Sequence, residues 1–134
     1  MELKKGSSKF ITIIKKNNGY KEFYKTFSQG SESLIKIEKG DETHFFKGIE
    51  GEERLVKKEY SNGNKVIYEG PKGKEYYVRA ELANGNKFYF DGKKDTEKLV
   101  KIEQTDGKIL IFDIVENNMV LSQIIQPCGD KIIY

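Results

Sequence analysis

The chain has 134 residues, of which 24 are basic and 21 acidic, for a net charge of +3, and 37% of its residues are apolar. This length corresponds to one domain, residues 1–134, and the interspersed charges exclude the clustered positive patch of a dedicated DNA-binding protein. The one cysteine, Cys128, excludes an internal disulfide framework. The apolar run at residues 10–14 is too short for a signal peptide or a membrane span, so we expect a cytoplasmic protein.

The turn residues recur every 22 positions along the chain. Five positions carry glycine directly after Asn, Asp or Cys, and at the sixth, Gly40-Asp41, the glycine stands one residue early. The six positions are Gly19, Asp41, Gly63, Gly85, Gly107 and Gly129. Because a fixed period is typical of repeat architectures, we predict six hairpin repeats of 22 residues.

In chain order, the turns separate segments that are rich in Val, Ile, Tyr and Phe. The segments before the turns include residues 33–39, 54–60, 76–82, 98–104 and 120–126. The segments after the turns carry an aromatic residue five positions beyond each mark, and this aromatic column is Tyr24, Phe46, Tyr68, Phe90, Phe112 and Tyr134. The composition is typical of strands, and the segments are too short for helices. Longer turns at Gly48, Gly70 and Gly92 join one hairpin to the next.

The predicted fold class is all-β, with an antiparallel meander of about twelve strands built from the six repeats. We expect these strands to form an extended, twisted single sheet. A closed β-barrel is the alternative, because closure would remove both edges of the sheet.

The turn chemistry also predicts how the strands pair. A three-residue turn with a left-handed glycine places Glu59 opposite Lys65. Under strict alternation, one face of the sheet carries the aromatic column. The other face carries the charged residues together with Leu55, Tyr77 and Leu99. The segment that contains Leu34 is one residue out of step with the others, as is the glycine at position 40.

The middle of the chain resembles the MORN class of repeats, which are short hairpins with an Asn-Gly turn, an aromatic residue, an acidic residue and glycine. The matching residues are Asn62-Gly63 with Tyr68-Glu69-Gly70, and Asn84-Gly85 with Phe90-Asp91-Gly92. The same stretch is similar to repeat arrays of algae and large DNA viruses. The resemblance implies a role in protein assembly, and in some members contact with a membrane surface.

We expect no enzymatic activity, cofactor or metal. His44, the one histidine, occupies a column that is apolar in the other repeats, so we interpret it as a substituted strand position. A catalytic triad or a metal site needs partners of a kind that the sequence lacks. The recurring glutamates are interpreted as a structural ladder that faces lysines, because a catalytic pair would be needed once only. They are Glu38, Glu59, Glu81 and Glu103.

We therefore predict a non-enzymatic repeat module for protein–protein interaction or self-assembly, with the aromatic column as its candidate binding face. The alternative partner is single-stranded nucleic acid or a membrane surface, bound through aromatic residues and a candidate basic row. This basic row is Lys57, Arg79 and Lys101. The glutamates beside it should repel phosphates, which disfavours the alternative. Ile132, Ile133 and Tyr134 predict an apolar edge strand and hence a homodimer, packed edge to edge or face to face.

Overall fold

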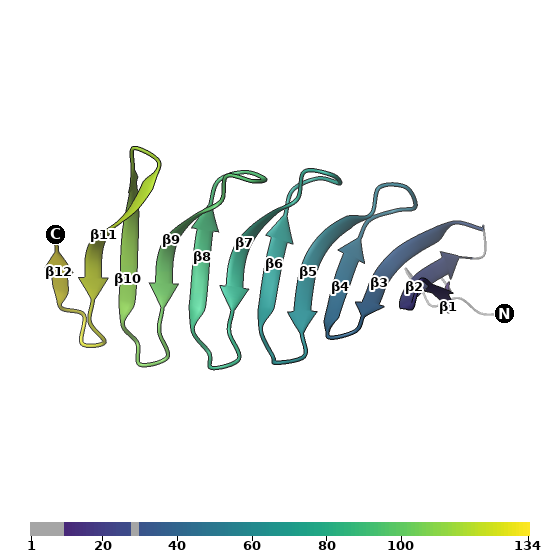
Figure 1. Ribbon diagram of the computed structural model, residues 1–134, viewed down its shortest axis with the longest axis horizontal. Coiled ribbons are helices and arrows are strands. Elements are labelled where there is room, and N and C mark those ends of the chain that lie inside the picture. Colours follow the sequence, from purple (N-terminus) through teal and green to yellow (C-terminus); the bar gives the residue numbers. More distant parts are fainter. Residues whose placement is uncertain (1–9, 28–29) are drawn as a thin grey trace, which may run out of the picture.

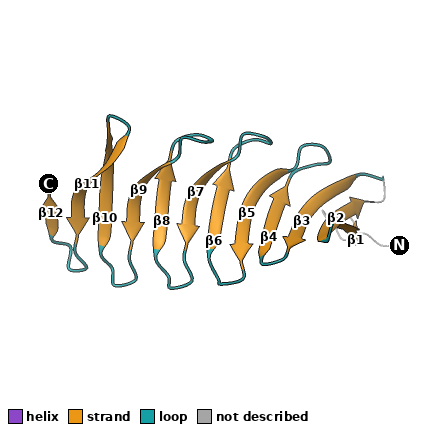
Figure 2. Cartoon of the chain, in the orientation of Figure 1, coloured by secondary structure: helices purple, strands orange, loops and turns teal. Residues whose placement is uncertain are grey.

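The computed structural model describes residues 10–27 and 30–134, which form strands joined by turns (Figures 1 and 2). The strands are β1 (Phe10–Asn17), β2 (Tyr20–Phe27), β3 (Glu32–Lys39), β4 (Glu42–Lys47), β5 (Arg54–Tyr60), β6 (Lys65–Glu69), β7 (Tyr76–Glu81), β8 (Lys87–Asp91), β9 (Lys98–Glu103), β10 (Ile109–Val115), β11 (Asn118–Ile125) and β12 (Lys131–Ile133). The predicted all-β class is confirmed.

The twelve strands lie in one sheet, and their order in the sheet is their order in the chain. Each strand pairs antiparallel with its chain neighbours, so the described chain is a continuous meander. In this sheet β1 and β12 each pair with one neighbour, and the sheet is open (Figure 1). The predicted meander and the extended single sheet are confirmed, and the closed alternative is not formed.

The short turns from the third hairpin onward have three residues, and their glycines are left-handed. The Tyr60 amide donates to the Asn64 carbonyl at 2.9 Å, and the Gly63 amide donates back to the Tyr60 carbonyl at 2.9 Å. Gly63 has a φ of 96°, which glycine adopts without the steric cost of a Cβ. The register is the predicted one, because Glu59 pairs with Lys65.

The first two hairpins have two-residue turns instead. Asn17 pairs with Tyr20 around Asn18-Gly19, and Lys39 pairs with Glu42 around Gly40-Asp41. Gly40 has a φ of 61°, as the first position of such a turn requires. The early glycine thus occupies the first position of this two-residue turn, and β3 is shifted by one residue toward the turn.

A β-bulge recurs in every pairing between one hairpin and the next from β2–β3 to β8–β9, and again between β10 and β11. The register shift always falls directly before a member of the aromatic column: Tyr24, Phe46, Tyr68, Phe90 and Phe112. A bulge inserts one unpaired residue and breaks strict alternation. Tyr77 therefore pairs with Tyr68, and Leu55 and Leu99 pair with Phe46 and Phe90. The prediction that Leu55, Tyr77 and Leu99 lie on the charged face is wrong for this reason.

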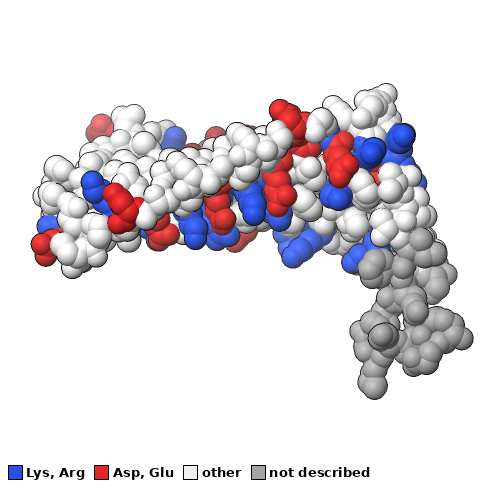
Figure 3. Space-filling view, turned by 90° about the horizontal axis from the view of Figure 1, so that it is seen from below, with Lys and Arg blue, Asp and Glu red and all other residues white. Residues whose placement is uncertain are grey.

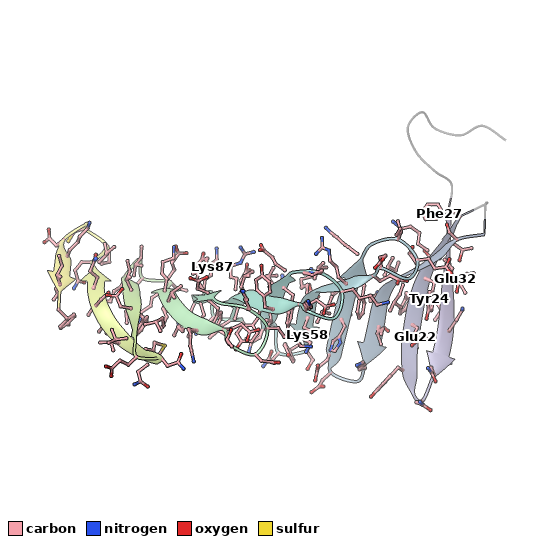
Figure 4. All side chains as sticks on the ribbon, turned by 90° about the horizontal axis from the view of Figure 1, so that it is seen from above. Glu22, Tyr24, Phe27, Glu32, Lys58 and Lys87 are labelled. Atoms are coloured by element: carbon pink, nitrogen blue, oxygen red, sulfur yellow. The ribbon has the colours of Figure 1, made fainter. Side chains whose placement is uncertain are left out.

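The described sheet has no second layer, and side chains project from both of its sides (Figure 4). Among the described residues no apolar side chain is buried, and the buried residues are Ser33 and His44, at 7% and 9% exposure. Many apolar side chains of β3–β11 are instead half-covered by their neighbours in the same face, and others such as Ile49 and Ile133 are exposed. The stability of the sheet therefore depends on contacts along rows of side chains and on the turns at its two rims.

Candidate binding surfaces

One side of the sheet over β6–β11 carries two adjacent rows of uncharged side chains, and we name this surface the apolar face. Its first row follows the pairing Val66–Ala80–Phe88–Ile102–Leu110–Ile124. Its second row consists of Tyr68, Tyr77, Phe90, Leu99, Phe112 and Leu121. All twelve side chains are half-buried, so each still reaches solvent. The apolar face is therefore a continuous, uncovered apolar surface.

The rings of the apolar face contact each other edge to face. The ring of Tyr77 lies 6.3 Å from that of Tyr68 and 4.8 Å from that of Phe90, both at an interplanar angle of 84°. These rings, with Val66, line a shallow hollow whose floor is the small side chain of Ala80. Burial raises the pKa of the Tyr68 hydroxyl, so Tyr68 stays neutral. The hollow is thus an apolar depression bordered by aromatic rings, with the Lys58 ammonium 5.5 Å from the centre of the Tyr68 ring at its edge.

The β10–β11 hairpin extends the apolar face beyond the neighbouring turns (Figure 1). Ile114 pairs with Met119, and they are 40% and 48% exposed. Where β6 and β8 lead into glycine turns at Gly70 and Gly92, β10 continues to a two-residue turn. That turn is Glu116-Asn117, with φ values of 51° and 67°. The extra length projects two more apolar side chains from the rim of the sheet.

The opposite side of the sheet, which we name the charged face, carries the predicted basic row. The cations alternate with apolar residues in the pairing Lys36–Phe45–Lys57–Ile67–Arg79–Tyr89–Lys101. Beside them runs the row Glu38–Thr43–Glu59–Lys65–Glu81–Lys87–Glu103. Figure 4 shows Lys87 on the side of the layer opposite to Lys58, which pairs with Val66 of the apolar face. The sequence therefore placed the basic row and the glutamates correctly on one face.

The ion pairs of the charged face run along the strands. Each cation contacts the glutamate two residues further on: Lys57–Glu59 at 2.9 Å, Arg79–Glu81 at 2.8 Å, and Lys36–Glu38 and Lys101–Glu103 at 3.5 Å. Lys65 and Lys87 lie across from Glu59 and Glu81 as predicted. The close contacts of these two glutamates, however, are with Lys57 and Arg79 of their own strands. Figure 3 likewise shows both signs interleaved along the molecule.

Aromatic rings hold three of these cations in place. The ammonium groups lie over rings of the adjacent strand, Lys36 over Phe23 at 4.3 Å, Lys57 over Phe45 at 4.6 Å and Lys101 over Tyr89 at 4.4 Å. The Tyr89 hydroxyl donates to Glu103 at 2.9 Å, and this bond, with the charge of Lys101, lowers the pKa of Glu103. Each cation of the row thus has a carboxylate within 3.5 Å, which disfavours its contact with a phosphate.

Glutamates after the long turns connect each hairpin to the one before it. Glu75 accepts hydrogen bonds from the amides of Leu55 at 3.0 Å and Gly73 at 2.9 Å, and Glu53 does the same for Leu34 and Gly51. Partial burial would raise the pKa of Glu75, but these amide bonds outweigh it and lower the pKa. The repeated glutamate after each turn therefore has a structural role.

Further contacts between hairpins lie in both rims of the sheet. The ammonium groups of Lys72 and Lys94 donate to the carbonyls of Gly51 and Gly73 in the preceding turn, at 2.7 and 3.0 Å. At the opposite rim the Asn64 side chain accepts from the Ala83 amide at 2.8 Å. Both rims are therefore fixed by the same residue types in successive repeats.

The predicted binding residues do not form one uniform surface. Tyr68, Phe90 and Phe112 lie together on the apolar face, whereas Tyr24 lies among charges, with the Lys15 ammonium 4.4 Å from its ring and its hydroxyl 3.1 Å from Glu22. Tyr134 follows β12 and is 70% exposed. The sequence-based prediction placed Tyr77 on the charged face and did not include Ala80 among the binding residues. The aromatic pair Tyr76-Tyr77 was visible in the sequence, but the bulge that turns Tyr77 to this face was not.

His44 lies in β4 as expected, and its Nε2 is 2.9 Å from a Glu42 carboxylate oxygen. In the part of the chain that the structure describes, no three His, Cys, Asp or Glu side chains gather as metal ligands. No helix capable of crossing a membrane occurs in residues 10–27 and 30–134.

The chain matches no protein-family model and no curated protein. Its class follows from its own architecture, in which hairpins of 22 residues repeat the same turns, bulges and glutamate contacts along one sheet. It is an antiparallel β-hairpin repeat protein.

Proposed function

We propose that this protein is a non-enzymatic interaction module that binds a protein partner through the apolar face. The observation that carries the proposal is that the two rows over β6–β11 form a continuous surface of uncharged, half-exposed side chains, with the Lys58 ammonium over the Tyr68 ring at its β6 edge. Soluble proteins rarely leave large contiguous apolar patches exposed unless those patches take part in binding. A repeat sheet presents such a surface over an extended length, as scaffold modules do.

The charged face supports this assignment by its own properties. A surface that binds nucleic acid or an anionic membrane needs positive charge that is free to meet phosphates. Here Lys57, Arg79 and Lys101 each have a carboxylate within 3.5 Å. Binding of single-stranded nucleic acid or a membrane surface therefore remains the second candidate, since it would require these ion pairs to open.

The resemblance to MORN repeats fits the same proposal. The Asn-Gly turns that carry the resemblance lie in one rim of the sheet, and Tyr68 and Phe90 belong to the second row of the apolar face. We accordingly propose that this module is a MORN-like scaffold and that it acts in the cytoplasm.

Capture of partners with matched variants tests the proposal. The immobilised wild-type chain is compared with Ala80→Arg, which places a charge in the hollow of the apolar face. The control is Thr43→Arg, because Thr43 lies on the charged face between Glu38 and Glu59 and can accept a cation. We expect proteins retained from an extract of the source cells by the wild type and the control but not by Ala80→Arg.

Two results would contradict the proposal. One is retention of the same proteins by Ala80→Arg, which would place the binding surface elsewhere. The other is selective retention of oligonucleotides or anionic vesicles that is lost steeply as salt is raised, which is the behaviour of a phosphate-binding surface.

A further inference from the structure

The proposed function does not identify the partner that binds the apolar face. We infer that the partner is a second copy of this chain, packed face to face so that two apolar faces form the core of a two-layer sandwich. This inference rests on the proposed function, because it uses the same surface. It goes beyond it by naming the occupant and the geometry.

The apolar face is regular along the sheet. Its second row carries one large apolar side chain on each strand, paired as Tyr68–Tyr77, Phe90–Leu99 and Phe112–Leu121, and Ala80 is the one small side chain of the first row. Successive strands lie about 4.8 Å apart. A two-fold axis parallel to the strands would lay this regular row over its own copy, displaced by half a strand spacing, so that the large side chains of the two copies interdigitate.

The hollow around Ala80 also favours a second copy as the partner. Its walls are the rings of Tyr68, Tyr77 and Phe90, and its lining is apolar. A ring that entered this hollow would meet the edges and faces of other rings, which is the arrangement that aromatic side chains favour. In a second copy, the second row of the apolar face carries rings of this kind on β6, β7, β8 and β10.

The area of the apolar face follows from the dimensions of its strands. Six strands at about 4.8 Å spacing, each with about six residues at about 3.3 Å rise, give roughly 600 Å² of flat surface per copy. Two copies would bury roughly 1,200 Å², which reaches the lower end of the range for stable protein complexes. Ile114 and Met119 add to this area at the rim. The apolar face is therefore large enough to hold a dimer together.

Charged side chains on the same side of the sheet limit the extent of the apolar face. Toward β1 this side carries Lys58, paired with Val66, and Lys15, paired with Glu22. The charge-free surface thus has a definite limit at β6, and a second copy would overlap with the first over β6–β11. Sheets packed in this way lie about 10 Å apart.

Sedimentation and small-angle scattering of the wild type and two variants test the inference. We expect a concentration-dependent dimer whose cross-section is thicker than that of one sheet by about 10 Å and whose length remains near that of a single sheet. Ala80→Arg should raise the dimer dissociation constant by at least about tenfold, because it places a charge in an apolar interface. Thr43→Arg should leave the constant unchanged.

Phe88→Gln is a second variant on the apolar face, and its far-ultraviolet circular dichroism reports whether the sheet is retained. A wild type that remains monomeric at every concentration would overturn the inference. A dimer of doubled length would also overturn it, because that shape means edge-to-edge pairing. Either result would overturn the face-to-face dimer but not the proposed function, which the capture experiment tests separately. If the wild type retains a different protein and Ala80→Arg does not, the apolar face is the binding surface for that protein.

Discussion

The ring of Tyr77 packs edge to face against the ring of Phe90 at 4.8 Å, within the hairpin formed by β7 and β8. Tyr77 reaches Phe90 because the bulge between β6 and β7 turns its side chain onto the apolar face, where it also contacts Tyr68 of the preceding hairpin. One residue thus joins two repeats. In a sheet without a buried core, such contacts are the main apolar packing between neighbouring units.

Removing this ring should destabilise the sheet. We expect Tyr77→Ser to lower the free energy of unfolding by about 2 kcal/mol, because a half-buried ring and two edge-to-face contacts are lost. Urea unfolding followed by circular dichroism measures the change. The control is Tyr134→Ser, which removes a ring that is 70% exposed and should change stability by no more than about 0.5 kcal/mol. Equal losses in the two variants would show that Tyr77 does not connect the repeats.

The glutamate after each long turn should stabilise the junction between hairpins. In Glu75→Ala the amides of Leu55 and Gly73 lose their acceptor, and we expect a loss of about 1–2 kcal/mol in the free energy of unfolding. Glu52→Ala, at an exposed position of the preceding turn, is the matched control and should be nearly neutral. Hydrogen exchange should also become faster at Leu55 in the first variant, and an unchanged rate there would contradict the assigned contact.

Stability should fall in acid. The pKa values of Glu53 and Glu75 are lowered because their amide hydrogen bonds outweigh the effect of partial burial. The Lys57 ammonium likewise lowers the pKa of Glu59 by a hydrogen bond. A carboxyl group whose pKa is lower in the folded state stabilises the fold above its ordinary pKa of 4.5, and this contribution is lost as the pH falls through the folded value.

Thermal unfolding between neutral pH and pH 3 checks this dependence. The melting temperature of the wild type should decrease as the pH is lowered below about 4.5. The double variant Glu53→Gln/Glu75→Gln should melt lower at neutral pH but show a shallower decline in acid. A double variant with the full decline of the wild type would contradict the role of these two carboxylates.

The glutamates of the charged face should mask its cations. We expect the triple variant Glu59→Gln/Glu81→Gln/Glu103→Gln to gain salt-sensitive affinity for single-stranded oligonucleotides, because Lys57, Arg79 and Lys101 lose their carboxylate partners. The wild type should bind the same oligonucleotides much more weakly. Fluorescence anisotropy at two salt concentrations measures both. If the wild type binds as tightly as the variant, the ion pairs do not block phosphates.

The repeat and the strand register could be predicted from the sequence because turn chemistry determines them. The three-residue turn around the left-handed Gly63 determines the pairing of Glu59 with Lys65, whereas the left-handed Gly19 stands in a two-residue turn. The aromatic column followed from its regular spacing. These are local properties, and each is repeated in several units, so they remain visible despite variation in single residues.

Other features could not be predicted because they depend on contacts between hairpins. A β-bulge leaves no compositional mark, and so Tyr77 was assigned to the wrong face. The role of Glu75 depends on the Leu55 amide, 20 residues earlier in the chain, which lies beside it only in the folded sheet. The ion pairs along strands depended on side-chain conformation, since Glu59 has lysines both across the hairpin and two residues away.

Hydroxyl-radical footprinting most directly tests the central claim that the apolar face is the functional surface. Oxidation of Tyr68, Phe90 and Met119 is compared with that of Tyr89, which lies on the charged face. The comparison is made for the free chain and for the chain in complex with its protein partner or with a second copy. We expect protection of the first three residues on complex formation, with Tyr89 unchanged. Protection of Tyr89 while Tyr68, Phe90 and Met119 stay reactive would contradict the account.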